Sequence, residues 1–213
     1  MQGFSRSSHK IRFRRAAQLL GVLWLVTAAA CATAPPKDVE NICSIFKEKK
    51  SWYKAAKKSE ERWGTPKHVQ MAIIRQESSF EFDAKPPRTK LLGFIPWKRP
   101  SDAYGYAQAL DSTWGWYKDD TGRLFADRDD FKDAIDFVGW YTHVSYKTVG
   151  ISQWDPYNQY LAYHEGQTGW RRGTYKRKTW LKDTARRVDY RAREWGAQLK
   201  RCEDDLDDGW WIF

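Results

Sequence analysis

The sequence predicts an all-α or α-dominated fold, with at most one small pair of strands. Apolar residues recur at helical spacing in several long segments, with charged residues between them. No segment shows a convincing alternation of apolar and polar residues, which is typical of a half-buried strand. The length of 213 residues fits one well-buried domain with appendages, and no linker or internal repeat indicates a second domain.

The N-terminal 30 residues have the layout of a secretory signal peptide. A basic stretch ends at Arg15, an apolar run covers residues 16–26, and a tail of small residues follows. The apolar run is too short to span a bilayer as an ordinary transmembrane helix. We therefore expect residues 1–30 to be removed on export.

Cys31 follows this tail and resembles the lipidated cysteine of a bacterial lipoprotein. Ala28 stands where leucine is usual in that pattern, so plain signal-peptidase cleavage with soluble export is the alternative. Ala32, rather than aspartate, resembles the outer-membrane sorting pattern. We expect a periplasmic protein anchored to the outer membrane through a diacylated Cys31, with residues 31–38 as a tether and residues 39–213 as one domain.

Charge and aromatic content narrow the choice of partner. The net charge of +10 falls to +5 when the five basic residues of the leader are removed, leaving 32 basic against 27 acidic residues. This modest excess fits a polyanion such as nucleic acid, anionic lipid or cell-wall polymer. Export argues against nucleic acid. The 13 tryptophans, 11 tyrosines and 10 phenylalanines suit either a tight core or a groove lined with flat rings.

Cys43 and Cys202 lie near the two ends of the predicted domain. In an oxidising compartment an even pair is most simply a disulfide, and two separate buried thiols are the alternative. The sequence has no CxxC or HExxH motif, and its histidines are scattered, so we predict no metal site.

In chain order, a first helix is expected over residues 39–59, where apolar residues recur at helical spacing among lysines. A second helix is expected over residues 66–78. Thr65 is suited to its N-cap and Pro66 to its first turn.

Glu77 is the most informative residue of the second helix. Val69 and Ile73 are four residues apart and mark an inward face, on which Glu77 is the next position. Burial disfavours a charged carboxylate and raises its pKa, which suits a proton donor near neutral pH. The alternative is that Glu77 ends the helix and points at water.

Periodicity is lost between residues 81 and 104, where four prolines exclude a long helix. Residues 91–97 are too apolar for simple disorder. We expect this long loop to form a flap or a groove wall, with a membrane-facing patch as the alternative.

The rest of the chain again shows helical patterns. An acidic segment at residues 203–208 and an aromatic end at residues 209–213 close the chain. The predicted elements are a short capped helix at residues 111–117, a long core helix over residues 129–148, a helix that begins at Asp155-Pro156, and an amphipathic helix over residues 181–199. The third of these helices leads into residues 164–169, where glycines are expected to end it.

Three short motifs follow one another in the order and spacing of a known pattern. They resemble the lytic transglycosylases of the soluble-lytic-transglycosylase (SLT) type, whose domain is lysozyme-like and akin to goose-type lysozyme. The resemblance covers about residues 63–170 and implies that the loop over residues 81–104 is an insertion. The motifs are Glu77-Ser78-Ser79-Phe80, Gly105-Tyr106-Ala107-Gln108 and Ala162-Tyr163-His164-Glu165-Gly166.

The resemblance implies a peptidoglycan-cleaving enzyme, a glycan lyase that needs no cofactor. Glu77 would be its single catalytic acid and base, cutting the bond between N-acetylmuramic acid and N-acetylglucosamine to leave a 1,6-anhydro sugar. Tyr163 would lie close enough to hydrogen-bond to Glu77, and the two motif glycines would allow positive φ or close backbone approach. The residues expected to contact or orient substrate are Ser78, Gly105, Tyr106, Gln108 and Tyr163, with helix-end capping as the alternative for Ser78 and a core position as the alternative for Tyr163.

Two departures from the family pattern are expected to change the groove. Tyr106-Ala107 replaces the usual Leu-Met, and His164-Glu165 stands where Asn and a small residue are common. If Glu165 faced Glu77, a second carboxylate would favour hydrolysis. The alternatives are therefore a lysozyme-type hydrolase or a non-catalytic peptidoglycan-binding lipoprotein. The sequence gives no prediction of the oligomeric state.

Overall fold

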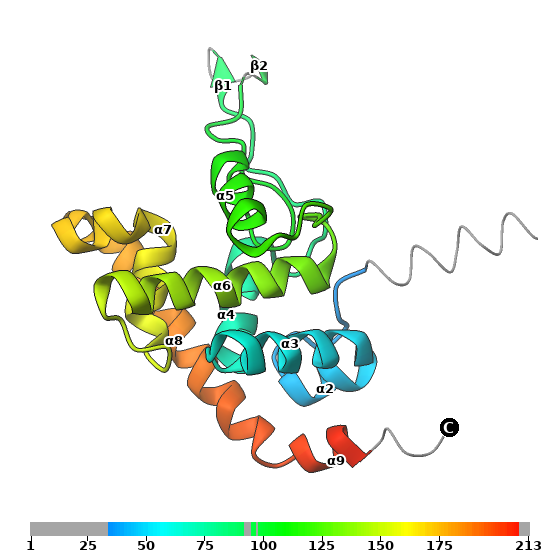
Figure 1. Ribbon diagram of the computed structural model, residues 1–213. Helices are drawn as coiled ribbons and strands as arrows, with labels where there is room; N and C mark the ends of the chain where they lie inside the picture. The colour runs from blue at the N-terminus through cyan, green and yellow to red at the C-terminus, as the bar shows by residue number, and fades with distance from the viewer. Residues whose placement is uncertain (1–33, 92–94, 97, 209–213) are drawn as a thin grey trace, which may run out of the picture. The chain divides into compact units, whose positions relative to one another are not determined.

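The computed structural model describes residues 34–91, 95–96 and 98–208, without the side chains of residues 90, 91, 95 and 96 (Figure 1). The chain divides into two units, and the second, which begins at residue 35, holds nearly all of the described residues. The expected signal peptide, Cys31, most of the apolar run in the loop and the aromatic end at residues 209–213 lie outside the described residues.

The second unit is helical, which confirms the predicted fold class. Each predicted helix is present, and the acidic segment near the end also forms a short one. The helices are α2 (Ile42–Glu48), α3 (Lys50–Trp63), α4 (Lys67–Ser78), α5 (Asp111–Thr121), α6 (Phe131–Val149), α7 (Pro156–Arg172), the 3₁₀ turn η1 (Thr174–Arg177), α8 (Thr179–Leu199) and α9 (Glu203–Asp208).

The first predicted helix is divided into α2 and α3 at Lys49, whose φ of −112° and ψ of 67° are not helical. Asn41 caps α2 by accepting hydrogen bonds from the backbone of Cys43 and Ser44. Thr65 does not cap α4, contrary to the prediction. Its hydroxyl lies 2.7 Å from the Thr142 hydroxyl, so it links α4 to α6 instead.

Helix α6 crosses the middle of the domain in Figure 1, with α3 packed below it and α5 above. Much of its surface is apolar and buried, as the long periodic pattern predicts. The indole of Trp52 on α3 stacks on Phe131 at the start of α6 with a centroid distance of 3.8 Å. Aromatic residues therefore build a large part of the core.

Buried Asp136 on α6 holds neighbouring elements together. Its carboxylate accepts hydrogen bonds from the Tyr117 hydroxyl at 2.7 Å and the Trp63 indole at 3.0 Å. The Arg123 guanidinium lies 3.1 Å away and compensates its charge. A buried carboxylate with these partners ties α3 and α5 to α6.

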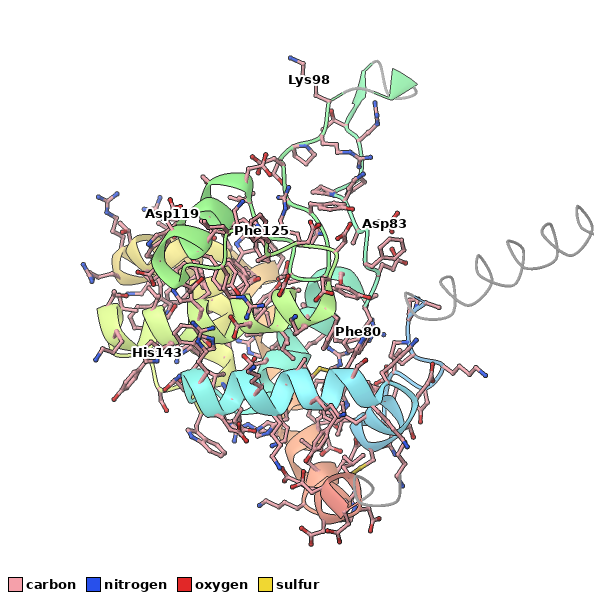
Figure 2. The ribbon with its side chains drawn as sticks, turned by 45° about the vertical axis from the view of Figure 1, so that its right-hand side comes forward. Phe80, Asp83, Lys98, Asp119, Phe125 and His143 are labelled. Atoms are coloured by element: carbon pink, nitrogen blue, oxygen red, sulfur yellow. A yellow bond between two sulfur atoms is a disulfide. The ribbon has the colours of Figure 1, made fainter. Side chains whose placement is uncertain are left out.

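The loop between α4 and α5 contains a two-stranded antiparallel hairpin, β1 (Lys90–Leu91) and β2 (Ile95–Pro96), in which Leu91 pairs with Ile95. The hairpin lies beyond α5 at the top of Figure 1. Figure 2 shows Phe80 where the loop begins, Asp83 farther along it, and Lys98 next to the hairpin. This is the small strand pair that the sequence allowed.

A disulfide joins Cys43 on α2 to Cys202 between α8 and α9, with the two Cα atoms 6.2 Å apart. The bond closes almost the whole second unit into one loop, as predicted. Within the described part of the chain, no helix is both long and apolar enough to cross a membrane.

Candidate active site

Glu77 lies in the last turn of α4, on the face that carries the buried residues Val69 and Ile73. The residue is partly exposed, while its carboxyl group is surrounded by protein. Burial raises the pKa of this carboxyl group to about 7, and a hydrogen bond with Tyr160 opposes the rise. At neutral pH the group can therefore both donate and accept a proton.

The turn that follows Glu77 has an unusual backbone. Ser79 and Phe80 have φ values of 56° and 68°, in the left-handed region that non-glycine residues rarely adopt. The Phe80 side chain is completely buried and packs against Trp52, with the ring centroids 5.4 Å apart and the ring planes tilted by 47°. This anchor holds the strained turn and so fixes the end of the helix that carries Glu77.

Ser78 is buried and bonds to the backbone of this turn. Its hydroxyl accepts a hydrogen bond from the Phe80 backbone at 3.1 Å and donates one to the Ile74 carbonyl at 3.3 Å. These contacts match helix-end capping, the alternative that the sequence left open. A contact between Ser78 and substrate stays a prediction.

Helix α7 brings two tyrosines to the carboxyl group. Tyr160 hydrogen-bonds to Glu77, and burial and the nearby carboxylate raise the pKa of both Tyr160 and Tyr163. The Tyr163 hydroxyl donates its proton to the Ala107 carbonyl at 2.6 Å, so a hydrogen bond between Tyr163 and Glu77, which stays a prediction, would have to be donated by the carboxyl group. Tyr163 remains beside Glu77 and links α7 to the second motif.

The second motif forms a tight turn against the long loop. Gly105 has a φ of 76°, and a Cβ atom there would lie 2.1 Å from the Arg128 carbonyl oxygen. The Gln108 side chain donates to the carbonyls of Ala84 at 2.8 Å and Gly105 at 3.0 Å. Positive φ and close approach at Gly105 are thus confirmed, while Gln108 uses its amide nitrogen to hold the loop.

Tyr106 does not line the groove, contrary to the prediction. Its side chain is 2% exposed and packs edge-on against Trp52 and Phe131 in the core. The bulk that replaces the usual leucine therefore fills the interior. The Tyr106 backbone nitrogen donates to the Arg128 carbonyl at 3.2 Å, which fixes the turn from the other side.

The third motif ends at a kink. Gly166 has a φ of 72° and a ψ of 160° inside α7, which confirms its predicted positive φ. Glu165, just before it, accepts bonds from Lys178 at 2.6 Å, from His164 at 3.0 Å and from Thr174. Burial raises the pKa of Glu165, but these bonds outweigh it and lower the pKa to about 2. Both carboxylate oxygens of Glu165 therefore accept hydrogen bonds where α7, η1 and the start of α8 meet.

The structure thus brings together Glu77, the backbone of the second motif and the tyrosines of α7. Sequence reasoning missed Tyr160. A signal was present, since Tyr160 and Tyr163 are three residues apart and share one helix face. In the described residues, no group of three or more metal-ligating side chains is close enough to hold an ion.

An α-helical domain with a desolvated glutamate at a helix end, next to tyrosines from a second helix, defines a lysozyme-like protein with one candidate acid-base carboxyl group. The family model described as "Transglycosylase SLT domain" matches residues 19–202, and the chain belongs to this family. No significant match was found among curated proteins or among solved structures.

Proposed function

We propose that this protein is a peptidoglycan lytic transglycosylase that cleaves the β-1,4 bond between N-acetylmuramic acid and N-acetylglucosamine. The observation that carries the proposal is Glu77, whose pKa of about 7 suits both halves of a proton shuttle. Membership of the SLT family supports peptidoglycan as the substrate and lyase-type chemistry.

In the first step, Glu77 donates its proton to the glycosidic oxygen as the bond from that oxygen to the anomeric carbon breaks. The substrate's own acetamido group stabilises the cation, an exception to the two-carboxylate scheme. Glu77 then takes the proton of the muramoyl 6-hydroxyl while that oxygen attacks the anomeric carbon. The product is a 1,6-anhydro sugar, Glu77 is protonated again, and no water is consumed.

Tyr160 and Tyr163 support this cycle from α7. The hydrogen bond from Tyr160 favours the ionised form of Glu77 and so offsets part of the effect of burial. Tyr163 holds the Ala107 carbonyl and so positions the second motif beside the carboxyl group. Glu165 is an unsuitable base for a hydrolytic water, because its oxygens are engaged by Lys178 and Thr174.

Mass spectrometry of muropeptides released from purified sacculi tests the proposal, with the Glu77→Gln protein run in parallel. We expect products lighter by one water than hydrolytic products, and none from Glu77→Gln. Reducing-end products would instead indicate a hydrolase. A lack of any product from the protein with Glu77 would favour a peptidoglycan-binding lipoprotein.

We also propose that the protein works in the periplasm, held at the outer membrane by a lipid on Cys31. The basis is the sequence of the first 32 residues. Detergent phase partitioning of the expressed full chain tests this proposal. The protein should enter the detergent phase, and Cys31→Ser should move it to the aqueous phase; equal partitioning of the two would contradict lipidation.

A further inference from the structure

A cavity of about 490 Å³ lies along α8. Trp195 forms part of its lining and is 1% exposed, whereas Tyr190 is 68% exposed. Helix α8 packs against α4, the helix that carries Glu77 in its last turn (Figure 1). The residues that line the cavity are Glu40, Arg186, Arg187, Tyr190, Arg191, Glu194, Trp195 and Gln198.

Arginine is the most frequent residue in this lining, and a fourth arginine lies behind it. Arg186 is paired with Asp183. Arg75 on α4 lies 3.7 Å from the Glu40 carboxylate and 2.8 Å from the Ser79 hydroxyl. Its Nε atom is buried and has no hydrogen-bond partner among the described residues.

Two of the cavity arginines lack a carboxylate partner. Arg187 donates to the Thr184 hydroxyl at 2.8 Å. Arg191 is half-buried, and in the part of the chain that the structure describes neither residue lies within ion-pair distance of an acidic group. Glu194 stands exposed at the rim. Burial, followed by the like charge of Arg75, lowers the pKa of Arg191, and the charge of Glu40 opposes this effect. Glu40 lines the same cavity and its charge partly offsets that of Arg191, but its ion pair is with Arg75. Arginine therefore remains in excess over glutamate in the lining, and guanidinium groups bind carboxylates in a bidentate manner.

The cavity adjoins the candidate active site. Arg187 interacts electrostatically with Tyr160, the residue that hydrogen-bonds to Glu77. A ligand group at the Arg187 end of the cavity would therefore lie near Tyr160, which contacts the Glu77 carboxyl group.

We propose that Arg187 and Arg191 bind a carboxylate of the peptide stem attached to the muramoyl residue next to the scissile bond. This inference rests on the proposed function, because peptidoglycan supplies the glycan strand. Its peptide stems carry carboxylates and hang from the lactyl group of muramic acid, so a stem can leave the strand beside the reacting sugar. The stem contact makes the enzyme selective for glycan that carries charged peptides.

Titration calorimetry of the Glu77→Gln protein tests the proposal with a soluble tetrasaccharide that carries tetrapeptide stems. The second ligand is the same molecule after its carboxylates are converted to primary amides with carbodiimide and ammonia. We expect the charged ligand to bind about tenfold or more tightly than the amidated one. Adding Arg191→Gln should abolish this difference, and Arg191→Lys should restore only part of it.

Arg193→Gln is the matched control, because Arg193 is exposed on another face of α8 and paired with Asp189 at 2.8 Å. It should keep the full preference for the charged ligand. Equal affinity for the two ligands, or no binding of either, overturns the inference. If Arg191→Gln fails to fold, the affinities of the charged and the amidated ligand for the Glu77→Gln protein still test the inference. Failure of the proposed function is seen separately, as an absence of anhydro products when the protein with Glu77 digests sacculi.

Discussion

The hydroxyl of Tyr160 on α7 forms a hydrogen bond with the Glu77 carboxyl group at the end of α4. Burial raises the pKa of Glu77 and this bond lowers it, and burial prevails. The packing of two helices therefore sets the protonation of the group that would do the chemistry.

Tyr160→Phe should raise the pKa of Glu77 above about 7, since the hydrogen bond that opposes the rise is lost. In the first step Glu77 acts as an acid, so activity falls as pH rises through its pKa. The falling limb of the pH–rate profile should move to higher pH, as measured by product release from sacculi. Tyr146→Phe, at a tyrosine that is 48% exposed on α6, is the control and should leave the profile unchanged. An unshifted limb in Tyr160→Phe would contradict the role of this bond.

Glu77→Gln should stabilise the protein at alkaline pH and leave its stability unchanged in acid. Burial raises the pKa of Glu77 from 4.5 to about 7 on folding, so the folded carboxyl group holds a proton that the unfolded one releases. The native protein loses stability as pH rises through this window, whereas glutamine does not ionise. The difference in the free energy of unfolding should reach up to about 3 kcal/mol above the window and vanish below it.

Urea unfolding on both sides of the pH window measures this difference. Glu61→Gln, at an exposed position of α3, is the control and should stay within about 0.5 kcal/mol of the native protein at each pH. A Glu77→Gln protein that gains nothing at alkaline pH would show that the carboxyl group is well solvated.

The sequence predicted more of the helices than of the contacts between them. Residues 129–148 and 181–199 form the expected helices because their periodicity is long and regular. The break at Lys49 has no glycine or proline signal, and the sequence alone could not locate it. Thr65 was assigned to a cap because its local sequence suits one, but its hydroxyl faces Thr142, far along the chain.

In the candidate site, too, the sequence predicts positions within a helix better than contacts between helices. Glu77 could be predicted because it lies on the apolar face of its own helix. Tyr160 and Tyr163 share a helix face, and which hydroxyl meets Glu77 depends on how α7 is placed against α4 and the Ala107 carbonyl. The burial of Tyr106 likewise depends on Trp52 and Phe131, residues from other segments.

Gly105→Ala should destabilise the protein strongly. The added methyl group would overlap the Arg128 carbonyl at 2.1 Å, and a φ of 76° adds strain. Gly122→Ala is the matched control, because Gly122 has a φ of 69° but no atom within 4 Å of the added Cβ. We expect about 1 kcal/mol of destabilisation in the control and at least about 2 kcal/mol more in Gly105→Ala by urea unfolding. Equal losses would show that the turn shifts freely.

Replacing Cys43 and Cys202 by serine should lower the free energy of unfolding by up to about 4 to 5 kcal/mol, because the loop that the disulfide closes spans 159 residues. Urea unfolding of the oxidised protein and the double variant measures the loss. Reductant should lower the stability of the native protein to about that of the variant, and leave the variant unchanged. Alkylation of the native protein without reductant should label neither cysteine, as read by intact mass.

Because Cys43 and Cys202 enclose the long loop between α4 and α5, a protease that cuts this loop would leave one covalently connected molecule. The fragment with Glu77 would stay tethered to the fragment with Tyr160 and Tyr163. Without reductant the cleaved protein would keep the mobility of a single species in denaturing gels, and with reductant it would separate into two. The disulfide thus links the two parts of the candidate active site covalently, in addition to their packing. Cleavage of the loop therefore does not separate them.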